Sequence, residues 1–252
     1  MKDKDTLFNF KNKLLLSVFS GILLTIFLLT SFTYFTTDHY LQKELHKQTE
    51  ANLQGITIIF DDYKNYALAH AKNLAINENI IEGLKEKDQQ SLFEMTSPLM
   101  DNGELDYLVI TDKAGNVVIR THVPGEIPTD NISNQRNIQM ALKGEPGVCM
   151  EVGKVVQLSI RGAAPIIDEE TGEIIGALST GFVISENSLV ELAKSAFNAE
   201  FTLYSNNERV ASTLMDENNQ PYAGFLEDEE TYERILNEEN LVTHREDLFG
   251  TS

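Results

Sequence analysis

The first feature of the hydrophobic pattern is an apolar run without charged residues, from Leu14 to Thr37. About 20 apolar residues in a helix are enough to cross a hydrocarbon core that is about 30 Å thick. A cleaved secretory signal is the alternative, but its apolar core has only about 7–15 residues and ends at a small-residue cleavage site. This run is longer, and no such site follows it. We therefore predict a transmembrane helix over residues 14–37, preceded by a stub over residues 1–13.

A second pattern, in which apolar residues recur three or four positions apart, covers residues 38–82. This period is typical of an amphipathic helix, and no proline interrupts it. A spacing near 3.5, as at Leu41, Leu45 and Leu53, also suits two helices that pair along their length. We predict a long signalling helix that forms a homodimer. A helix that lies on its own domain is the open alternative.

From Gly83 onward the pattern changes to short elements of both types. Helices are predicted over residues 88–100, 135–143 and 185–197, and strands over residues 105–112, 117–123, 148–152, 155–166 and 174–184. A helix, a hairpin, a short helix and three antiparallel strands follow each other in the order of a PAS-like α+β domain. We predict such a domain over residues 83–197, with a five-stranded antiparallel sheet that wraps a small-molecule pocket.

The remaining residues, 198–252, begin another unit. The sequence predicts a hairpin over residues 200–213, a turn at residues 216–220 and a helix over residues 227–239. This stretch is too short for a second sheet of five strands. We therefore expect the start of a second, partial PAS-like module.

Charge sets the orientation and excludes some partners. Lys2, Lys4, Lys11 and Lys13 precede the apolar run, and Asp38 follows it. Lysines beside a span stay on the cytoplasmic side, so we expect a single-pass protein of the cytoplasmic membrane with residues 38 onward outside. The formal net charge of −19 argues against nucleic acid or an anionic lipid surface as the partner of the folded part.

Motifs for catalysis or cofactor binding are not found in the sequence. The lone Cys149 excludes an internal disulfide and is read as a small core residue. The five histidines lack metal-ligand spacing, and no GxSxG, P-loop or GxGxxG occurs. We therefore expect a binding protein that is not an enzyme and that carries no cofactor and no metal.

Three blocks of sequence resemble the extracytoplasmic Cache family of bacterial receptors: DYLVITDKAGNVVIRTHVP (106–124), QLSIRGAAPIIDEETGEIIGALSTGFVIS (157–185) and FTLYSNNERVASTLMDENNQPYAGF (201–225). The last block is similar to the opening of the second module in chemoreceptors of the fused Cache 3/Cache 2 type. The first two are also similar to the sensor domains of citrate and C4-dicarboxylate sensor kinases. The resemblance implies a ligand-sensing domain.

Arginines in apolar strands are the candidate ligand-binding residues. Arg161 lies in an apolar strand on the same face as Ser159 and Ala163, because alternate residues of a strand share a face. A buried guanidinium is costly without an anion, and it is the best bidentate partner for a carboxylate. Arg120 and His122 also share a face. An internal salt bridge to one of the 39 acidic residues is the alternative for each.

The resemblance assigns roles to these positions. In the dicarboxylate and citrate sensors, an arginine and a histidine before a proline bind carboxylates, together with an arginine before the later proline strand. Arg161 matches the last of these, whereas Arg120 and His122 match with one residue fewer between them. Ala163 stands where citrate binders have a lysine, which disfavours a tricarboxylate.

Four further residues are weaker candidates. Arg136 and Asn137 begin the predicted short helix near the pocket, although an arginine there is usually solvated. Ser179 and Thr180 lie in the last strand and offer hydroxyl groups or main-chain amides to a ligand.

Together these features favour a transmembrane sensor of a small carboxylate. A chemoreceptor is the first expectation for its output, and a histidine kinase or a cyclase is the second. A pilin-like structural subunit is a distant third, because such subunits place a glutamate within the apolar run and residues 14–37 contain none.

Overall fold

The structure is a computed structural model of the whole chain. It describes residues 2–102, 105–123, 125, 127–151, 158–184, 188–205, 207–216, 218–225 and 233, and the side chains of residues 2–11, 101 and 151 are not described. The chain divides into two units, Met1–Leu53 with Arg245–Ser252, and Gln54–His244.

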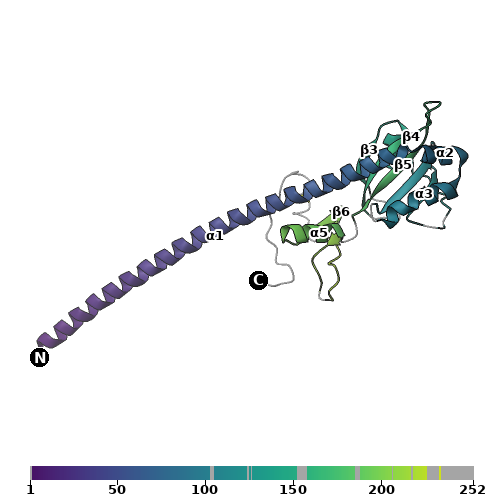
Figure 1. Cartoon of the computed structure of the whole chain (residues 1–252). Helices are drawn as coiled ribbons and strands as arrows, with labels where there is room; N and C mark the ends of the chain where they lie inside the picture. The colour runs from purple at the N-terminus through teal and green to yellow at the C-terminus, as the bar shows by residue number, and fades with distance from the viewer. Residues whose placement is uncertain are drawn as a thin grey trace. The chain divides into compact units, whose positions relative to one another are not determined.

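The N-terminal element is a single helix, α1 (Lys2–Ala75), which is labelled in Figure 1. The large apolar side chains between Leu14 and Phe35 are exposed along it. The helix is long and apolar enough to cross a membrane, and it is the one candidate span among the described residues. This agrees with the predicted apolar helix over residues 14–37.

The helix predicted over residues 38–82 ends earlier, at Ala75, because the chain starts a new helix at that point. Asn77 is the N-cap of α2 (Glu78–Glu86), and its side-chain oxygen accepts a hydrogen bond from the amide of Asn79 at 3.0 Å. An N-cap residue has extended backbone angles, so α1 cannot continue through it. Asp88 caps α3 (Gln89–Asp101) in the same way, which matches the predicted helix over residues 88–100.

Five antiparallel strands form the main sheet. They are β1 (Tyr107–Asp112), β2 (Val117–Arg120), β3 (Gly147–Glu151), β4 (Ser159–Ile167) and β5 (Ile174–Val183). Their order is β2-β1-β5-β4-β3, and each neighbouring pair is antiparallel. The predicted PAS-like sheet is confirmed, with β2 ending at Arg120 instead of residue 123.

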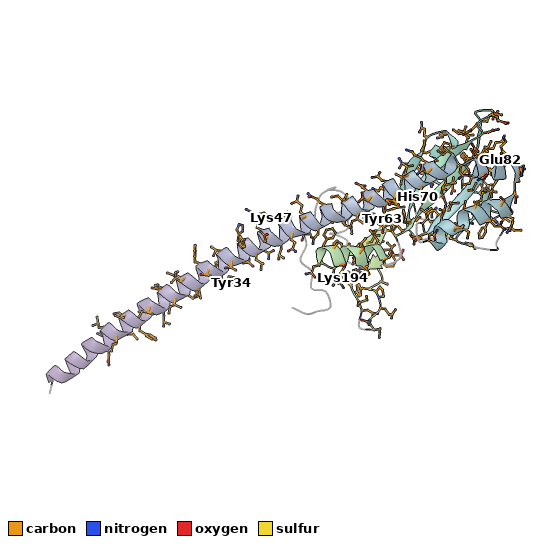
Figure 2. The ribbon with its side chains drawn as sticks, viewed as in Figure 1. Tyr34, Lys47, Tyr63, His70, Glu82 and Lys194 are labelled. Atoms are coloured by element: carbon orange, nitrogen blue, oxygen red, sulfur yellow. The ribbon has the colours of Figure 1, made fainter. Side chains whose placement is uncertain are left out.

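One face of this sheet packs against α1, α2 and α3, and we call it the α1 face. Its strands contribute Leu108, Ile110, Ile160, Gly162, Ala164, Ile166, Leu178 and Thr180. Figure 1 shows the last turns of α1 beside β4 and β5. Tyr63, labelled in Figure 2, meets Phe182 of β5 edge-on, with 4.9 Å between the ring centroids. This face buries most of the aliphatic core.

The opposite face of the sheet is covered by the short helix α4 (Arg136–Leu142), and we call it the α4 face. Its strands contribute Tyr107, Val109, Ser159, Arg161, Ala163, Ala177 and Ser179. Ile138 and Ala141 of α4 pack against the apolar members of this set. Gly144, with φ +92°, follows the helix and ends it, as the sequence predicts.

The last described part contains α5 (Ser188–Phe197) and a hairpin of β6 (Thr202–Ser205) and β7 (Glu208–Ser212). The predicted turn at residues 216–220 forms, since the amide of Gln220 donates to Asp216 at 2.8 Å. Most of the helix predicted over residues 227–239, and the predicted cap at residue 185, lie outside the described residues.

Candidate functional site

The side chain of Arg161 is buried on the α4 face. Its exposed fraction is 7%, and its neighbours across the strands are Cys149 and Gly181. The Nε atom donates to the hydroxyl of Ser159 at 2.6 Å, and the guanidinium carbon lies 5.5 Å from the ring centroid of Tyr107. Among the described residues Arg161 makes no ion pair. It is a cation held in a core by a hydroxyl and an aromatic ring.

Tyr107 supports this arginine from β1. Its ring is buried, and its hydroxyl donates to the carbonyl of Ile160 at 3.2 Å. Burial raises the pKa of Tyr107, so the phenol stays protonated. A Cβ atom at Gly181 would lie 2.2 Å from the Tyr107 hydroxyl, so the glycine leaves the space that the phenol occupies.

His122 lies in the turn that follows β2, and it packs against the same tyrosine. The two rings are edge-on, with centroids 5.7 Å apart. The Nδ1 atom is buried and has no hydrogen-bond partner in the described part of the chain. Burial, followed by repulsion from Arg120 and Arg161, lowers the pKa of His122 from 6.5 to about 4. The imidazole is therefore neutral at pH 7.

Ser179 and Asn137 extend the polar group along the α4 face. Asn137 is 0% exposed on α4, and its Nδ2 atom donates to the hydroxyl of Ser179 at 2.9 Å. Its Oδ1 atom has no hydrogen-bond partner among the described residues. The sequence analysis gives Asn137 only as a weaker candidate at the start of the predicted short helix.

Thr180 is predicted beside Ser179 as a ligand contact, but the two side chains lie on opposite faces of the sheet, and the ligand role of Thr180 stays a prediction. Neighbouring residues of a strand point to opposite faces, so only one of the two hydroxyls reaches the α4 face. The Thr180 hydroxyl lies on the α1 face and donates to the carbonyl of Ala67 at 2.7 Å. Its role is to join the sheet to α1.

The other two predicted arginines have surroundings that differ from those of Arg161. Arg120 makes a bidentate pair with Asp130, at 3.1 Å from Nη1 and 2.7 Å from Nη2. This is the internal salt bridge that the sequence analysis gives as the alternative, and the ligand role of Arg120 stays a prediction. Arg136 is exposed at the first position of α4, and its ligand role also stays a prediction.

The groups gathered here are of the types that can bind anions and polar groups. Arg161 supplies positive charge, while His122, Ser179 and Asn137 supply neutral donors and acceptors. Tyr107 and Ser159, which the sequence analysis did not select as ligand contacts, hold the arginine in place. Their signal in the sequence is weak, because a tyrosine and a serine in an apolar strand also fit an ordinary core. No cluster of metal ligands occurs in the portion of the chain that the structure describes.

A protein-family comparison gives one clear match. The family described as the double sensory domain of two-component sensor kinases (dCache_3) matches residues 42–246. Among curated proteins, the sensor histidine kinase DpiB of Escherichia coli (strain K12) is 30% identical over 139 residues. That match covers 53% of this chain and 24% of DpiB, so the chain corresponds to about a quarter of this relative.

Solved structures of sensor domains are also similar. The sensor domain of the V. cholerae histidine kinase DctB has a TM-score of 0.55 at 10% identity, and the match covers 68% of each chain. The E. coli DcuS sensor domain is 24% identical with a TM-score of 0.45, over 55% of this chain and 97% of that one. The likeness to DctB shows that the fold is shared.

Proposed function

The chain belongs to the family of double sensory domains of two-component sensor kinases, and from that premise we propose that it binds a small carboxylate on the α4 face. The observation that carries this proposal is Arg161. A guanidinium that is 7% exposed, without an ion pair among the described residues, leaves a positive charge that a carboxylate can neutralise.

The neighbours of Arg161 support a ligand of this class. Ser159 holds Nε, so the terminal nitrogens can form the two parallel bonds that a carboxylate accepts. His122 is neutral beside it and can donate to, or accept from, a second polar group of the ligand. Ala163 adds no charge to this face, which fits a mono- or dicarboxylate better than a tricarboxylate.

For the location, we propose that α1 crosses the cytoplasmic membrane once and that the sheet domain lies outside. The exposed apolar side chains between Leu14 and Phe35, and the lysines that precede them, support this orientation. A cysteine placed at Asn219 should react with an impermeant thiol reagent on intact cells. Labelling only after the cells are broken open would contradict the orientation.

For the output, we propose a histidine kinase. The description of the family and the similarity to DpiB support this choice. The chemoreceptor output, which the sequence analysis places first, is not confirmed and stays a prediction, as does a cyclase.

Dimerisation through the helix also stays a proposal. Leu41, Leu45 and Leu53 are about half exposed in the single chain, and pairing of two helices would bury them. Light scattering in detergent should give the mass of a dimer, and glutamate at Leu45 and Leu53 should lower it. A wild-type monomer at micromolar concentration would rule out the dimer for this chain.

Ligand binding is the direct test of the function. The full chain in detergent micelles is melted with acetate, propionate, lactate, succinate, malate or citrate. A ligand present at one hundred times its dissociation constant adds about 2.7 kcal/mol of stability. Arg161→Ala should remove this shift, because truncation of one partner of a buried charge pair costs about 2–5 kcal/mol of binding. Arg161→Lys should keep part of it.

Arg209→Ala is the matched control. Arg209 is also a guanidinium on aromatic rings, lying 5.3 Å from Tyr204 and 4.6 Å from Tyr222, but it belongs to the small hairpin. Its removal should leave the carboxylate shift in place. If Arg161→Ala retains the wild-type response to the best ligand, then Arg161 has a structural role and the proposed site is wrong.

A further inference from the structure

Asn137 is a buried amide with an unused hydrogen-bonding atom. Its side chain is 0% exposed, and Nδ2 is bonded to Ser179 while Oδ1 has no partner in the described part of the chain. If the two amide atoms are exchanged, the atom without a partner is the Nδ2 donor, and a hydroxyl group, which both donates and accepts, can pair with it as well. Buried polar groups are nearly always hydrogen-bonded, so an unused one indicates a missing partner.

The position of this amide relative to Arg161 defines what the partner is. Arg161 faces Gly181 across the strands, and Ser179 lies two residues before Gly181 on the same face. The backbone positions of such diagonal neighbours are roughly 7–8 Å apart, so the two residues can contact one small molecule. A carboxylate bound at Arg161 would therefore lie on the same face of the sheet as Ser179 and Asn137, one diagonal step away in the sheet.

From this juxtaposition we infer that Asn137 is a specificity-determining residue that accepts a hydrogen bond from a hydroxyl group of a small hydroxycarboxylate. The inference rests on the carboxylate site proposed above. An alcohol suits this position better than an ammonium group, because Arg161 and Arg120 already place positive charge on this side of the domain, as their effect on His122 indicates. Ser179 can rotate its own hydroxyl hydrogen toward the same ligand oxygen.

The apolar residues around Asn137 and Ser179 should make the preference for a hydroxylated acid strong. Val109, Ala163 and Ala177 flank Ser179 on the α4 face, together with Ile138 and Ala141 of α4. In this apolar setting the amide has no substitute partner among the described residues, so a ligand without the hydroxyl leaves it unsatisfied. The loss of one such hydrogen bond corresponds to about fivefold in affinity or more.

Matched pairs of acids test the inference. The full chain in detergent micelles is titrated by calorimetry with propionate and with each enantiomer of lactate, and with succinate and each enantiomer of malate. In the wild type, the better enantiomer of a hydroxylated acid should bind at least about fivefold more tightly than its unhydroxylated partner. In Asn137→Leu this preference should fall to less than about twofold, with the affinity for the unhydroxylated acid nearly unchanged.

Gln139→Leu is the control, since it makes the same type of change at an exposed position of α4 and should keep the preference. If Asn137→Leu does not fold, the inference is tested by the affinity ratio of hydroxylated to unhydroxylated acid in the wild type and in a Ser179→Ala variant. Equal affinity of the wild type for both members of each pair overturns the inference and leaves the carboxylate site intact. If no acid in the panel binds, the proposed function and this inference fail together.

Discussion

The two faces of the five-stranded sheet use their buried polar groups in opposite ways. On the α1 face, the hydroxyl of Thr180 is fully used, because it donates to the carbonyl of Ala67 at 2.7 Å. On the α4 face, Asn137 and His122 keep buried atoms without a partner among the described residues, and Arg161 has no ion pair there. The difference separates a face whose buried polar groups are satisfied within the protein from the face on which we propose that a ligand binds.

The same two strands carry both faces. Gly162 and Thr180 face each other across β4 and β5, and both touch α1 at Ala67. The next residues along these strands, Arg161 and Ser179, point to the α4 face. A ligand that binds one arrangement of these strands better than another therefore also biases the position of α1. We therefore expect the shared strands to connect the proposed site to the helix.

The largest expected effect comes from the close approach of β4 to α1. A Cβ atom at Gly162 would lie 2.5 Å from the carbonyl carbon of Ala67 and 2.5 Å from the amide of Leu68. Both are backbone atoms of a helix, so they cannot rotate away. Gly162→Ala should lower the free energy of unfolding by about 3 kcal/mol. Urea unfolding in detergent, followed by tyrosine fluorescence, measures this change.

Gly21→Ala is the control for this substitution, because no heavy atom lies within 4 Å of the added methyl group. It should leave the unfolding curve nearly unchanged. A Gly162→Ala variant as stable as the wild type would show that α1 is not held against the sheet as closely as the structure describes.

A smaller effect separates the two faces at neighbouring residues. Thr180→Val removes the bond to Ala67 and keeps the shape of the side chain, so stability should fall by about 1 kcal/mol while ligand affinity stays within about twofold. Ser179→Ala should have the reverse profile and weaken the best hydroxycarboxylate. Urea unfolding measures the stability of each variant, and calorimetry measures its affinity for the ligand. If Thr180→Val weakens the ligand as much as Ser179→Ala, the separation into faces is wrong.

Much of this fold could be predicted from the sequence. The alternation of apolar residues and the glycine-bearing turns locate all five strands, and the order of elements predicts the PAS-like sheet. The end of α1 could not be predicted in this way, because the cap at Asn77 interrupts a periodic pattern that continues into α2. A local hydrogen bond decides that boundary, and hydrophobic spacing does not report it.

The candidate site was predicted less completely, for a physical reason. Arg161 stands out because a charge in an apolar strand is rare, and the structure buries it on the face that the spacing predicts. Charge alone did not distinguish Arg120 from Arg161. Arg120 pairs with Asp130, which lies in a loop outside the strands. Asn137 carries no charge and no periodic signal, so its importance follows only from its unused oxygen atom.

The smallest expected effect concerns the pH dependence of the α4 face. Burial, Arg120 and Arg161 lower the pKa of His122 from 6.5 to about 4, so the folded chain binds a proton less readily than the unfolded chain between these values. Stability from this group is fully present above pH 6.5 and is lost as the pH falls toward 4. Between pH 7 and pH 5 we expect a loss of about 0.5 kcal/mol, after allowance for screening by solvent.

Glutamine cannot titrate, so His122→Gln should reduce the difference in unfolding free energy between pH 7 and pH 5 by about 0.5 kcal/mol. His46→Gln, at an exposed position of α1, is the control and measures the contribution of an unrelated histidine. A carboxylate bound at Arg161 would offset part of the positive charge near His122 and so raise its pKa toward the ordinary value. Saturating ligand should therefore shrink the pH effect in the wild type and have no such effect in His122→Gln. Identical pH profiles with and without ligand would place the bound carboxylate away from His122, and the α4 face would then need a different assignment of its ligand contacts.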